Sequence, residues 1–559
     1  MLTGTEYILR RISLLGVKHI FGIPGAHIYP FLLKSVGTGV ELIINCHELS
    51  AGYMADGYGR ASDKLGVLFG MGGPGSNNMV TAVNTARLER VPLLVITGDV
   101  PVHLSNVPGF QCANELGTHD DAIFKTIAKY SKRVSGIDDL AYLIEEAIRI
   151  ALTPPFGPAH LIIPYNVFTE ETSAQPQPTD YARLRFWKND RSTATLSRIR
   201  DLLASDKKVI FWIGDSLNRA GPAQQVICLA EKFHIPVATS FSAKGVFPEH
   251  HKLALGNFGY AGWSLAKAMF LSDSPDVIIG FDIEQNERNS LGWHADLYRG
   301  KELLLVNFPG SYSNKEYGES IEDNPFYILE SLYTSLINEV YDRHSRERWF
   351  QTILQGAGGE KARPIISPAR RIEPARLVQL LQKEMPRDAI LFVDSGEHRV
   401  FAGQNWKAPA AASFYSASVV APMGWALAAG IGCAFARNEP VIVFTGDGCM
   451  QMHGIELKTA IKYNRPLLVV LANNKAFGRI HRYLSTMSED AAKMAGIEEV
   501  DWKLFGQSFG AKVFDITSEE CFIESIRRFL AEPRLTILNV STPVNPYHHD
   551  VTLARSAFA

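Results

Sequence analysis

Cysteine, net charge and metal-binding spacings are all scarce in this sequence. Its 559 residues include only six cysteines, with no CxxC pair and no Cys/His spacing typical of a metal site. We therefore expect reduced, buried thiols, as in a cytoplasmic protein. The formal net charge is −2, and the lysines and arginines are dispersed, which argues against a nucleic-acid or anionic-membrane partner.

Long apolar runs are also missing. No run is long enough to cross a bilayer, and helical periodicity starts at once near Tyr7, without a signal peptide. We expect a cytoplasmic protein with no membrane partner. Hydrophobic residues are nevertheless plentiful, at 46% of the chain, and the length is too great for one core.

Short apolar runs alternate with segments of helical periodicity along most of the chain. This alternation predicts parallel sheets covered by helices on both faces. Two polar, proline-containing stretches, 169–190 and 355–374, interrupt it. The sequence therefore predicts an α/β fold with three doubly wound domains of mainly parallel sheet, at residues 1–168, 190–355 and 367–545.

The clearest chemical pattern lies in the stretch 446–478. One apolar run there ends in Gly-Asp-Gly, and the next ends in Asn-Asn. In an open parallel sheet, ligands bind at the edge where the strands' carboxyl ends meet. Asp447 offers a carboxylate, Asn474 an amide oxygen and Ala476 a main-chain carbonyl. Three such oxygens, completed by phosphate oxygens and water, suit Mg²⁺.

This stretch resembles the diphosphate-binding signature of the thiamine diphosphate (ThDP) enzymes, in which GDG is followed by NN at the far end of a βαβ unit. Further motifs of that family occur in family order along nearly the whole chain. The resemblance implies metal ligands at Asp447, Asn474 and Ala476. It implies cofactor contacts at Glu48, Gly73, Pro74, Asn77, Gly396, Glu397, His398, Met423, Gly446, Gly448 and Cys449.

Glu48 has the most specific implied role. It follows an apolar run and precedes a helical pattern, so an N-terminal charge favoured by the helix dipole is the alternative. In the ThDP enzymes, the glutamate at this place bonds N1′ of the aminopyrimidine. That bond favours the imino tautomer, whose 4′-nitrogen takes the proton from C2 of the thiazolium. Met423, in a Pro-Met-Gly turn, matches the residue that forces the cofactor into a bent shape; a core methionine is the alternative.

Other residues are implied at the substrate. Phe110-Gln111 resembles the pair that lines the substrate pocket of acetolactate synthases. A Gly-Ala-His run ending at His27 resembles benzaldehyde lyase, whose histidine there works on the substrate hydroxyl, so His27 would be a general acid/base. His119 and Asp120 are interpreted as a surface pair, with catalysis as the alternative. The implied catalytic residues are Glu48, His27, Gln111 and Phe110, and the substrate pocket adds Gly25, Ala26, Phe477 and Tyr483.

The central domain departs from the family pattern. Synthases that bind FAD carry an Arg-Phe-Asp-Asp-Arg run here, whereas this chain has GFDIE at 280–284, with neither arginine. No GxGxxG follows a strand either. FAD therefore stays an open possibility that the sequence argues against, and a substrate-binding arginine is lost. Gly214 and Arg219 either contact a nucleotide or form a plain turn.

The segment after Asn474, in the C-terminal domain, is basic. Its residues Arg479, His481 and Arg482 either bind a substrate carboxylate or form a solvated face.

The resemblance implies an enzyme that uses ThDP and Mg²⁺ to form or cleave C–C bonds. The favoured expectation is acetolactate synthase-like decarboxylation of a 2-keto acid, such as pyruvate, with ligation to a second carbonyl. The alternatives are benzaldehyde lyase-like chemistry on a 2-hydroxy ketone and simple decarboxylation. A partner subunit without turnover is a third hypothesis, against which Glu48 and the metal motif argue. The family's cofactor spans two subunits, so we expect a homodimer or homotetramer with active sites at subunit interfaces.

Overall fold

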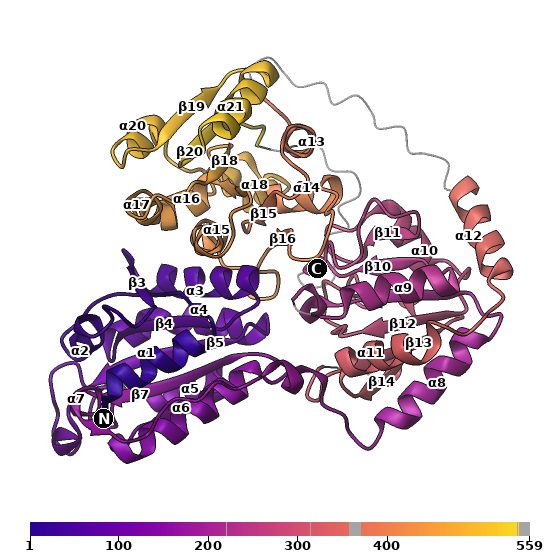
Figure 1. Ribbon diagram of the computed structural model, residues 1–559. Helices are drawn as coiled ribbons and strands as arrows, with labels where there is room; N and C mark the ends of the chain where they lie inside the picture. The colour runs from indigo at the N-terminus through magenta and orange to yellow at the C-terminus, as the bar shows by residue number, and fades with distance from the viewer. Residues whose placement is uncertain (220, 313–314, 357–370, 545, 547–559) are drawn as a thin grey trace.

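The structure is a computed structural model that describes residues 1–559 except 220, 313–314, 357–370, 545 and 547–559. Three sheets of six strands each build three α/β domains (Figure 1). Every strand pair within these sheets is parallel, which confirms the predicted fold class. Most of the expected second linker, and the tail from 547, lie outside the described residues.

The N-terminal sheet has the strand order β3-β2-β4-β5-β7-β6. Its strands are β2 (His19–Gly22), β3 (Glu41–Ile44), β4 (Gly66–Met71), β5 (Leu93–Asp99), β6 (Tyr130–Arg133) and β7 (Pro158–Pro164). Its main helices are α1 (Gly4–Leu14), α3 (Glu48–Ser62), α4 (Pro74–Leu88), α5 (Asp120–Ile127) and α6 (Ile137–Leu152). The strand order reverses between β2 and β4, and in sheets of this kind ligands bind at the carboxyl ends of the strands beside such a reversal.

The central sheet has the order β11-β10-β9-β12-β13-β14. Its strands are β9 (Val209–Ile213), β10 (Val237–Thr239), β11 (Ala254–Asn257), β12 (Val277–Phe281), β13 (Glu302–Asn307) and β14 (Glu319–Glu322). Helices α8 (Ser192–Ala204), α9 (Ala223–Phe233), α10 (Ser264–Leu271) and α11 (Pro325–Leu336) flank it, and α12 (His344–Gly356) follows. A separate hydrophobic cluster forms the core of this domain.

The C-terminal sheet has the order β16-β15-β17-β18-β20-β19. Its strands are β15 (Ile390–Val393), β16 (Phe414–Tyr415), β17 (Val441–Gly446), β18 (Leu468–Asn473), β19 (Lys512–Ile516) and β20 (Thr536–Ser541). Its helices include α13 (Pro374–Glu384), α14 (His398–Asn405), α15 (Trp425–Ala436), α16 (Asp447–His453), α17 (Leu457–Lys462), α18 (Gly478–Ser485), α20 (Trp502–Gln507) and α21 (Glu519–Ala531). The GDG and NN motifs thus lie at the carboxyl ends of the adjacent strands β17 and β18.

Helices α3 and α15 join the N-terminal and C-terminal domains of one chain (Figure 1). Their backbones approach so closely that a Cβ on Gly57 would lie 2.0 Å from the carbonyl oxygen of Ala429. One on Gly432 would lie 2.0 Å from the carbonyl oxygen of Met54. One hydrophobic cluster runs through both domains as a result. None of the helices that the structure describes is long and apolar enough to span a bilayer.

Candidate active site

Glu48 opens helix α3 at the carboxyl end of β3, with its side chain half-buried. Its Oε2 accepts a hydrogen bond from Asn78 Nδ2 at 3.0 Å, and a Cβ on Gly75 would lie 3.4 Å from its Oε1. Because both of those residues belong to α4, the structure places Glu48 beside the Gly-Pro-Gly turn. Pro74 and Asn77 are exposed at the start of α4. We call the surface around the carboxyl ends of β2, β3 and β4, together with the loop after β5, the N-terminal rim.

Asp120 holds that turn in place. Gly73 has a φ of 69°, which favours glycine. Its N–H donates to Asp120 Oδ2 at 3.2 Å, while Thr118 Oγ1 donates to Oδ1 at 2.5 Å. Asp120 is fully buried, and burial raises the pKa of its carboxyl. The interpretation of His119 and Asp120 as a surface pair is therefore wrong for Asp120, because the loop folds back over the turn.

The loop between β5 and α5 carries Phe110 and Gln111 to the same rim. Phe110 is 79% exposed, and Gln111, with a φ of 52°, has backbone atoms 3.4 Å from a Cβ on Gly73. Buried Asp99 anchors this loop, since its Oδ1 accepts from the N–H of Ala113 at 2.8 Å. Asp99 also binds Arg133 Nε at 2.9 Å. Sequence reasoning missed this anchor, which carries no motif.

His27 lies on this rim after β2. A Cβ on Gly98 would lie 2.6 Å from the carbonyl oxygen of His27, and one on Gly25 would lie 1.9 Å from Met71 Cγ. Ala26, between Gly25 and His27 in the sequence, is exposed. Burial lowers the pKa of His27, and Asp99 partly offsets this. Its Nδ1 is buried without a hydrogen-bond partner among the described residues.

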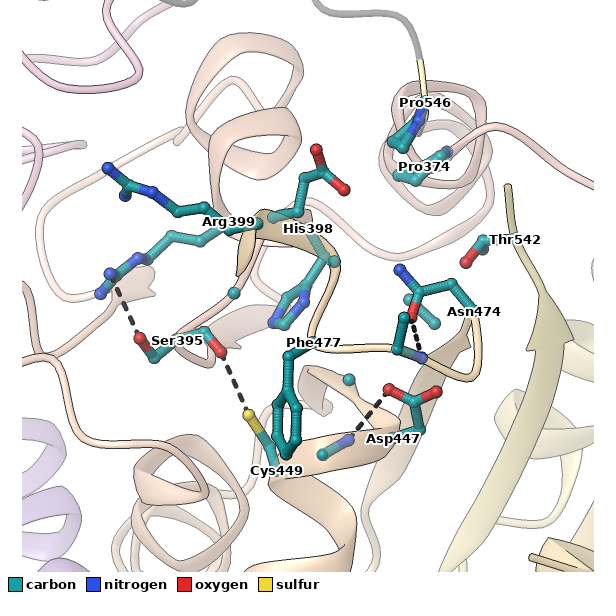
Figure 2. Close-up of a pocket in the computed structure, with 18 of the residues that line it drawn as sticks. Pro374, Ser395, His398, Arg399, Asp447, Cys449, Asn474, Phe477, Thr542 and Pro546 are labelled. Atoms are coloured by element: carbon teal, nitrogen blue, oxygen red, sulfur yellow. Dashed lines mark hydrogen bonds between the residues drawn. The ribbon is translucent and has the colours of Figure 1, made fainter. Parts of the chain in front are cut away.

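A pocket of about 210 Å³ lies at the carboxyl edge of the C-terminal sheet (Figure 2). Its lining includes the predicted residues Gly396, Glu397, His398, Met423, Gly446, Asp447, Gly448, Cys449, Asn474, Ala476 and Phe477. Tyr483 is not among the lining residues and is 53% exposed. The structure thus gathers the expected diphosphate and metal residues in one cavity and leaves Tyr483 outside it.

Asp447 and Asn474 face the same side of this pocket (Figure 2). Asp447 Oδ1 accepts from the N–H of Gly448 at 2.9 Å, and Oδ2 accepts from the N–H of Lys475 at 2.6 Å. Asn474 Oδ1 accepts from the N–H of Ala476 at 3.1 Å. Burial raises the pKa of Asp447, so a bound cation would favour its charged form. A carboxylate, an amide oxygen and a main-chain carbonyl fit Mg²⁺ with a diphosphate.

Glycine and a neutral histidine leave room next to these oxygens. A Cβ on Gly448 would lie 2.8 Å from Phe477 Cε1 and 3.0 Å from Met423 Cε, and one on Gly446 would lie 3.3 Å from His398 Cε1. Burial lowers the pKa of His398 to about 3, and its Nε2 is buried with no partner among the described residues. These groups, with Gly396 in contact with the histidine ring, could hold phosphate oxygens.

The wall around Met423 is held by buried Asp394. Asp394 Oδ1 accepts from the N–H of Gly424 at 2.9 Å, and Oδ2 accepts from Thr445 Oγ1 at 3.0 Å. The turn that carries Met423 is thereby tied to the ends of β15 and β17. Cys449 Sγ donates to the carbonyl oxygen of Ser395 at 3.1 Å, and burial raises the pKa of its thiol well above the ordinary value.

The basic segment after Asn474 divides into two parts. Arg482 pairs with Glu397 at 2.7 Å and donates to the carbonyl oxygen of Pro546 at 2.6 Å, so it is already engaged. Arg479 lines the pocket, whereas His481 does not. Glu397 therefore helps to position α18 as well as bordering the pocket.

Two arginines that sequence reasoning missed also line this pocket, Arg288 and Arg399. Arg288, in the loop after β12, donates to the carbonyl oxygen of Ser418 at 2.6 Å and stacks 4.7 Å from the Tyr260 ring. Arg399 is 2% exposed and donates to the carbonyl oxygen of Ala417 at 2.8 Å. Burial, with Arg399 next, lowers the pKa of Arg288. No ion pair neutralises Arg288, Arg399 or Arg479 within the described part of the chain.

At the carboxyl edge of the central sheet, the acidic side chains are engaged in contacts within the chain. Arg90, from the N-terminal domain, forms ion pairs with Asp282 and Glu284. Asp282 Oδ2 also accepts from the N–H of Ser216 at 2.9 Å, and a Cβ on Gly214 would lie 1.7 Å from the carbonyl oxygen of Asp282. The acids that stand in the place of the flavin-binding run are thus satisfied internally, and these residues do not fit FAD.

The predicted residues of the N-terminal domain do not line the C-terminal pocket of the same chain, although the two domains touch nearby, with Ser50 Oγ of α3 lying 2.9 Å from His453 Nδ1 of α16. The C-terminal pocket is lined by residues of the central and C-terminal domains, with none from the described N-terminal domain. Glu48, His27 and Phe110 lie instead on the separate rim formed by the N-terminal sheet.

Comparisons with known proteins match all three domains. Residues 2–120 match the thiamine pyrophosphate enzyme N-terminal TPP binding domain, residues 196–318 the central domain, and residues 394–540 the C-terminal TPP binding domain. Thiamine pyrophosphate is ThDP under another name. The matched ranges include Glu48, Asp447 and Asn474.

Individual relatives agree with these matches. The acetolactate synthase large subunit of Lactococcus lactis subsp. lactis (strain IL1403) is 28% identical over 94% of this chain and 90% of its own. The isozyme 1 large subunit of Escherichia coli (strain K12) is 26% identical over 96% and 93%. A solved Rhodococcus jostii RHA1 ThDP-dependent 4-hydroxybenzoylformate decarboxylase shares the fold, with a TM-score of 0.80 at 20% identity over 97% and 99%. The chain therefore belongs to the thiamine pyrophosphate enzyme family and is a ThDP-dependent enzyme.

Proposed function

We propose that this enzyme uses ThDP and Mg²⁺ to decarboxylate a 2-keto acid and to join the remaining acyl unit to a second carbonyl, as in acetolactate synthesis from pyruvate. The observation that carries this proposal is a group of three arginines at the pocket that form no ion pair among the described residues, Arg288, Arg399 and Arg479. A 2-keto acid brings a carboxylate, which a guanidinium fork binds well. A neutral aldehyde or hydroxy ketone gives these charges no partner.

Each half of the site has its own part in this proposal. When bound, ThDP supplies a thiazolium carbon that adds to a carbonyl and an electron sink for the loss of CO₂. Asp447, Asn474 and Ala476 would hold Mg²⁺, and the backbone at 446–449 would hold the diphosphate. Glu48 would hold a proton at the pyrimidine N1′. Met423 and Phe477 would exclude water from the reacting carbon.

A second copy of the chain would bring the two halves together. The N-terminal rim exposes Leu104, Val107 and Phe110, and the C-terminal face exposes Ile480 and Tyr483. Large exposed apolar residues beside a site indicate a surface that a partner covers. We therefore propose a homodimer, or a homotetramer built from it, in which Glu48 of one chain serves the Asp447 pocket of another.

FAD is not part of this proposal. The internal ion pairs of Arg90 with Asp282 and Glu284 occupy the position where flavin-binding relatives carry arginines. We expect the purified enzyme to work with ThDP and Mg²⁺ alone.

Product analysis tests the proposed reaction. We expect purified enzyme with ThDP, Mg²⁺ and pyruvate to release CO₂ and form acetolactate. Benzoin from benzaldehyde without acetolactate from pyruvate would contradict the proposal. It would favour the lyase alternative, for which the specific observation is that His27 Nδ1 has no hydrogen-bond partner in the described part of the chain. Aldehyde as the sole product would favour simple decarboxylation.

Replacing Arg288 tests whether the arginines bind the substrate carboxylate. We expect Arg288→Gln to raise the KM for the 2-keto acid about 10- to 100-fold, the loss expected for a hydrogen bond to a charged group. The Kd for ThDP should stay unchanged, and Arg288→Lys should retain part of the affinity. Steady-state kinetics and ThDP titration give both values.

The matched control is Arg299→Gln, in the same domain, because that side chain is 73% exposed and pairs only with Asp296 among the described residues. Its KM should equal that of the wild type. If Arg288→Gln weakens ThDP rather than the keto acid, the arginines bind the diphosphate and the substrate assignment is wrong.

A further inference from the structure

A second cavity, of about 620 Å³, lies where the three domains of one chain meet. The C-terminal ends of α3 and α15 form two of its walls, and the loop after β9 forms a third. Asn218 fixes that loop to the C-terminal domain, because its Nδ2 donates to the carbonyl oxygen of Phe414 at 3.2 Å and its Oδ1 accepts from the N–H of Ala412 at 2.9 Å. Among the residues that the structure describes, none lines both this cavity and the C-terminal pocket.

The lining of this cavity is strongly basic. Its charged side chains are Lys18, Arg60, Lys64, Arg219, Arg437, Arg465 and the single acid Asp63. Two of the cations are already neutralised, Arg60 by Asp56 and Arg437 by Glu439. Asp63 is itself paired with Arg185 at 2.9 Å. Lys18, Lys64, Arg219 and Arg465 have no ion pair within the described residues, so positive charge is in excess.

Arg219 shows this excess most clearly. The side chain is only 7% exposed, and its Nη1 is buried with no hydrogen-bond partner among the residues described. Burial, followed by the neighbouring Arg60, lowers its pKa to about 10. Nε of Arg465 and Nδ1 of His19 are likewise buried without partners. An uncompensated buried charge is costly, so a native protein is expected to pair it with an anion.

The remaining walls are apolar and aromatic. Tyr58 and Phe435 face the cavity together with alanines at 61, 411, 412, 434 and 436. Tyr58 and Phe435 are only 2% and 6% exposed, and the Arg465 guanidinium lies 4.4 Å from the Phe435 ring centroid, so neither ring offers an open face to a ligand. The cavity volume falls within the range of about 300–1,000 Å³ typical of small-molecule sites.

We propose that this cavity binds a small molecule that carries a diphosphate, with the phosphates against Arg219, Arg465 and Lys64. Guanidinium forks match phosphate oxygens in geometry and charge. The excess of positive charge suits a multiply charged anion. Because all three domains contribute to the cavity, the bound ligand would hold them together and raise the Tm.

Calorimetric titration of ADP into the full chain, kept saturated with ThDP and Mg²⁺, tests this site. Saturation with ThDP fills the active-site pocket, so competition there cannot mimic binding. We expect saturable binding that weakens at least about tenfold in Arg219→Gln and in Arg465→Gln, because each removes a charge-assisted hydrogen bond. The control Arg183→Gln, whose side chain is 91% exposed, should bind as the wild type does.

Thermal unfolding distinguishes a ligand-binding role for Arg219 from a structural one. Without ADP, Arg219→Gln should match or exceed the wild-type Tm, because it removes an uncompensated buried cation. With ADP, the wild-type Tm should rise and that of the variant should not. Three outcomes would overturn the proposal: no ADP binding in the ThDP-saturated enzyme, equal binding by both Arg variants, or a lower Tm for Arg219→Gln without ligand. Adenosine binding as tightly as ADP would also overturn it, and none of these outcomes bears on the keto-acid reaction.

Discussion

Glu48→Gln is expected to lower kcat about 100- to 10,000-fold, the range for losing a positioned proton-transfer group. Glutamine keeps the size of the side chain and its contact with Asn78 but cannot hold a negative charge. The helix that Glu48 opens should still form, because the N-cap of α3 is His47, whose Nδ1 accepts from the N–H of Leu49 at 3.1 Å. The effect should therefore appear in catalysis and not in folding.

The assay is steady-state turnover of the keto acid at saturating ThDP, with circular dichroism to check the fold. Glu146→Gln is the matched control, because that residue pairs with Arg149 at 2.8 Å on the surface of α6, in the same domain. It should retain full activity. Near-wild-type turnover by Glu48→Gln would show that Glu48 is only a helix-terminal charge.

Asp447→Asn should abolish metal-dependent binding of ThDP. Replacing even an outer partner of a metal ligand typically lowers metal affinity 10- to 100-fold, so we expect a loss of at least about 100-fold for a direct ligand. Asn keeps the acceptor for the N–H of Lys475 but brings no charge to a cation. Burial raises the pKa of Asp447 because it disfavours the charged carboxylate, and a bound cation would offset that cost.

Titration of ThDP at increasing Mg²⁺ measures this effect. The variant should need much higher Mg²⁺, and its Tm should no longer rise when both are added. Asp490→Asn is the control, because its side chain is 91% exposed and pairs with Lys493. Unchanged dependence on Mg²⁺ in Asp447→Asn would remove Asp447 from the metal site.

The sequence predicts the buried central strands of each sheet better than the edge strands. Strands such as β9 and β17 are buried throughout and form continuous apolar runs, so their positions are clear. The edge strands β6 and β14 read YSKR and ESIE, and neither an apolar run nor a clean alternation marks them. The strand-end motifs are predictable for a related reason. Glycine with an acid or amide directly after an apolar run is a local pattern, which the sequence shows without knowledge of the fold.

Functional residues that lie in loops are harder to predict from the sequence. Arg288 lies in a polar loop beyond β12, where only the three-dimensional path brings it to a pocket in another domain. Asp120 resembles an ordinary surface acid in the sequence, yet it is fully buried because the loop closes over Gly73. Phe110 and Tyr483 are 79% and 53% exposed in the single chain, so contacts within the chain do not reveal their role.

The most direct test of the account is complementation between Glu48→Gln and Asp447→Asn chains. If the N-terminal rim of one chain and the C-terminal pocket of another form each active site, a mixed dimer carries both substitutions in one site and none in the other. We predict that dimers assembled from two differently tagged variants recover roughly half of the wild-type turnover, as two-fold symmetry requires. Mixed dimers no more active than either variant alone would contradict the account.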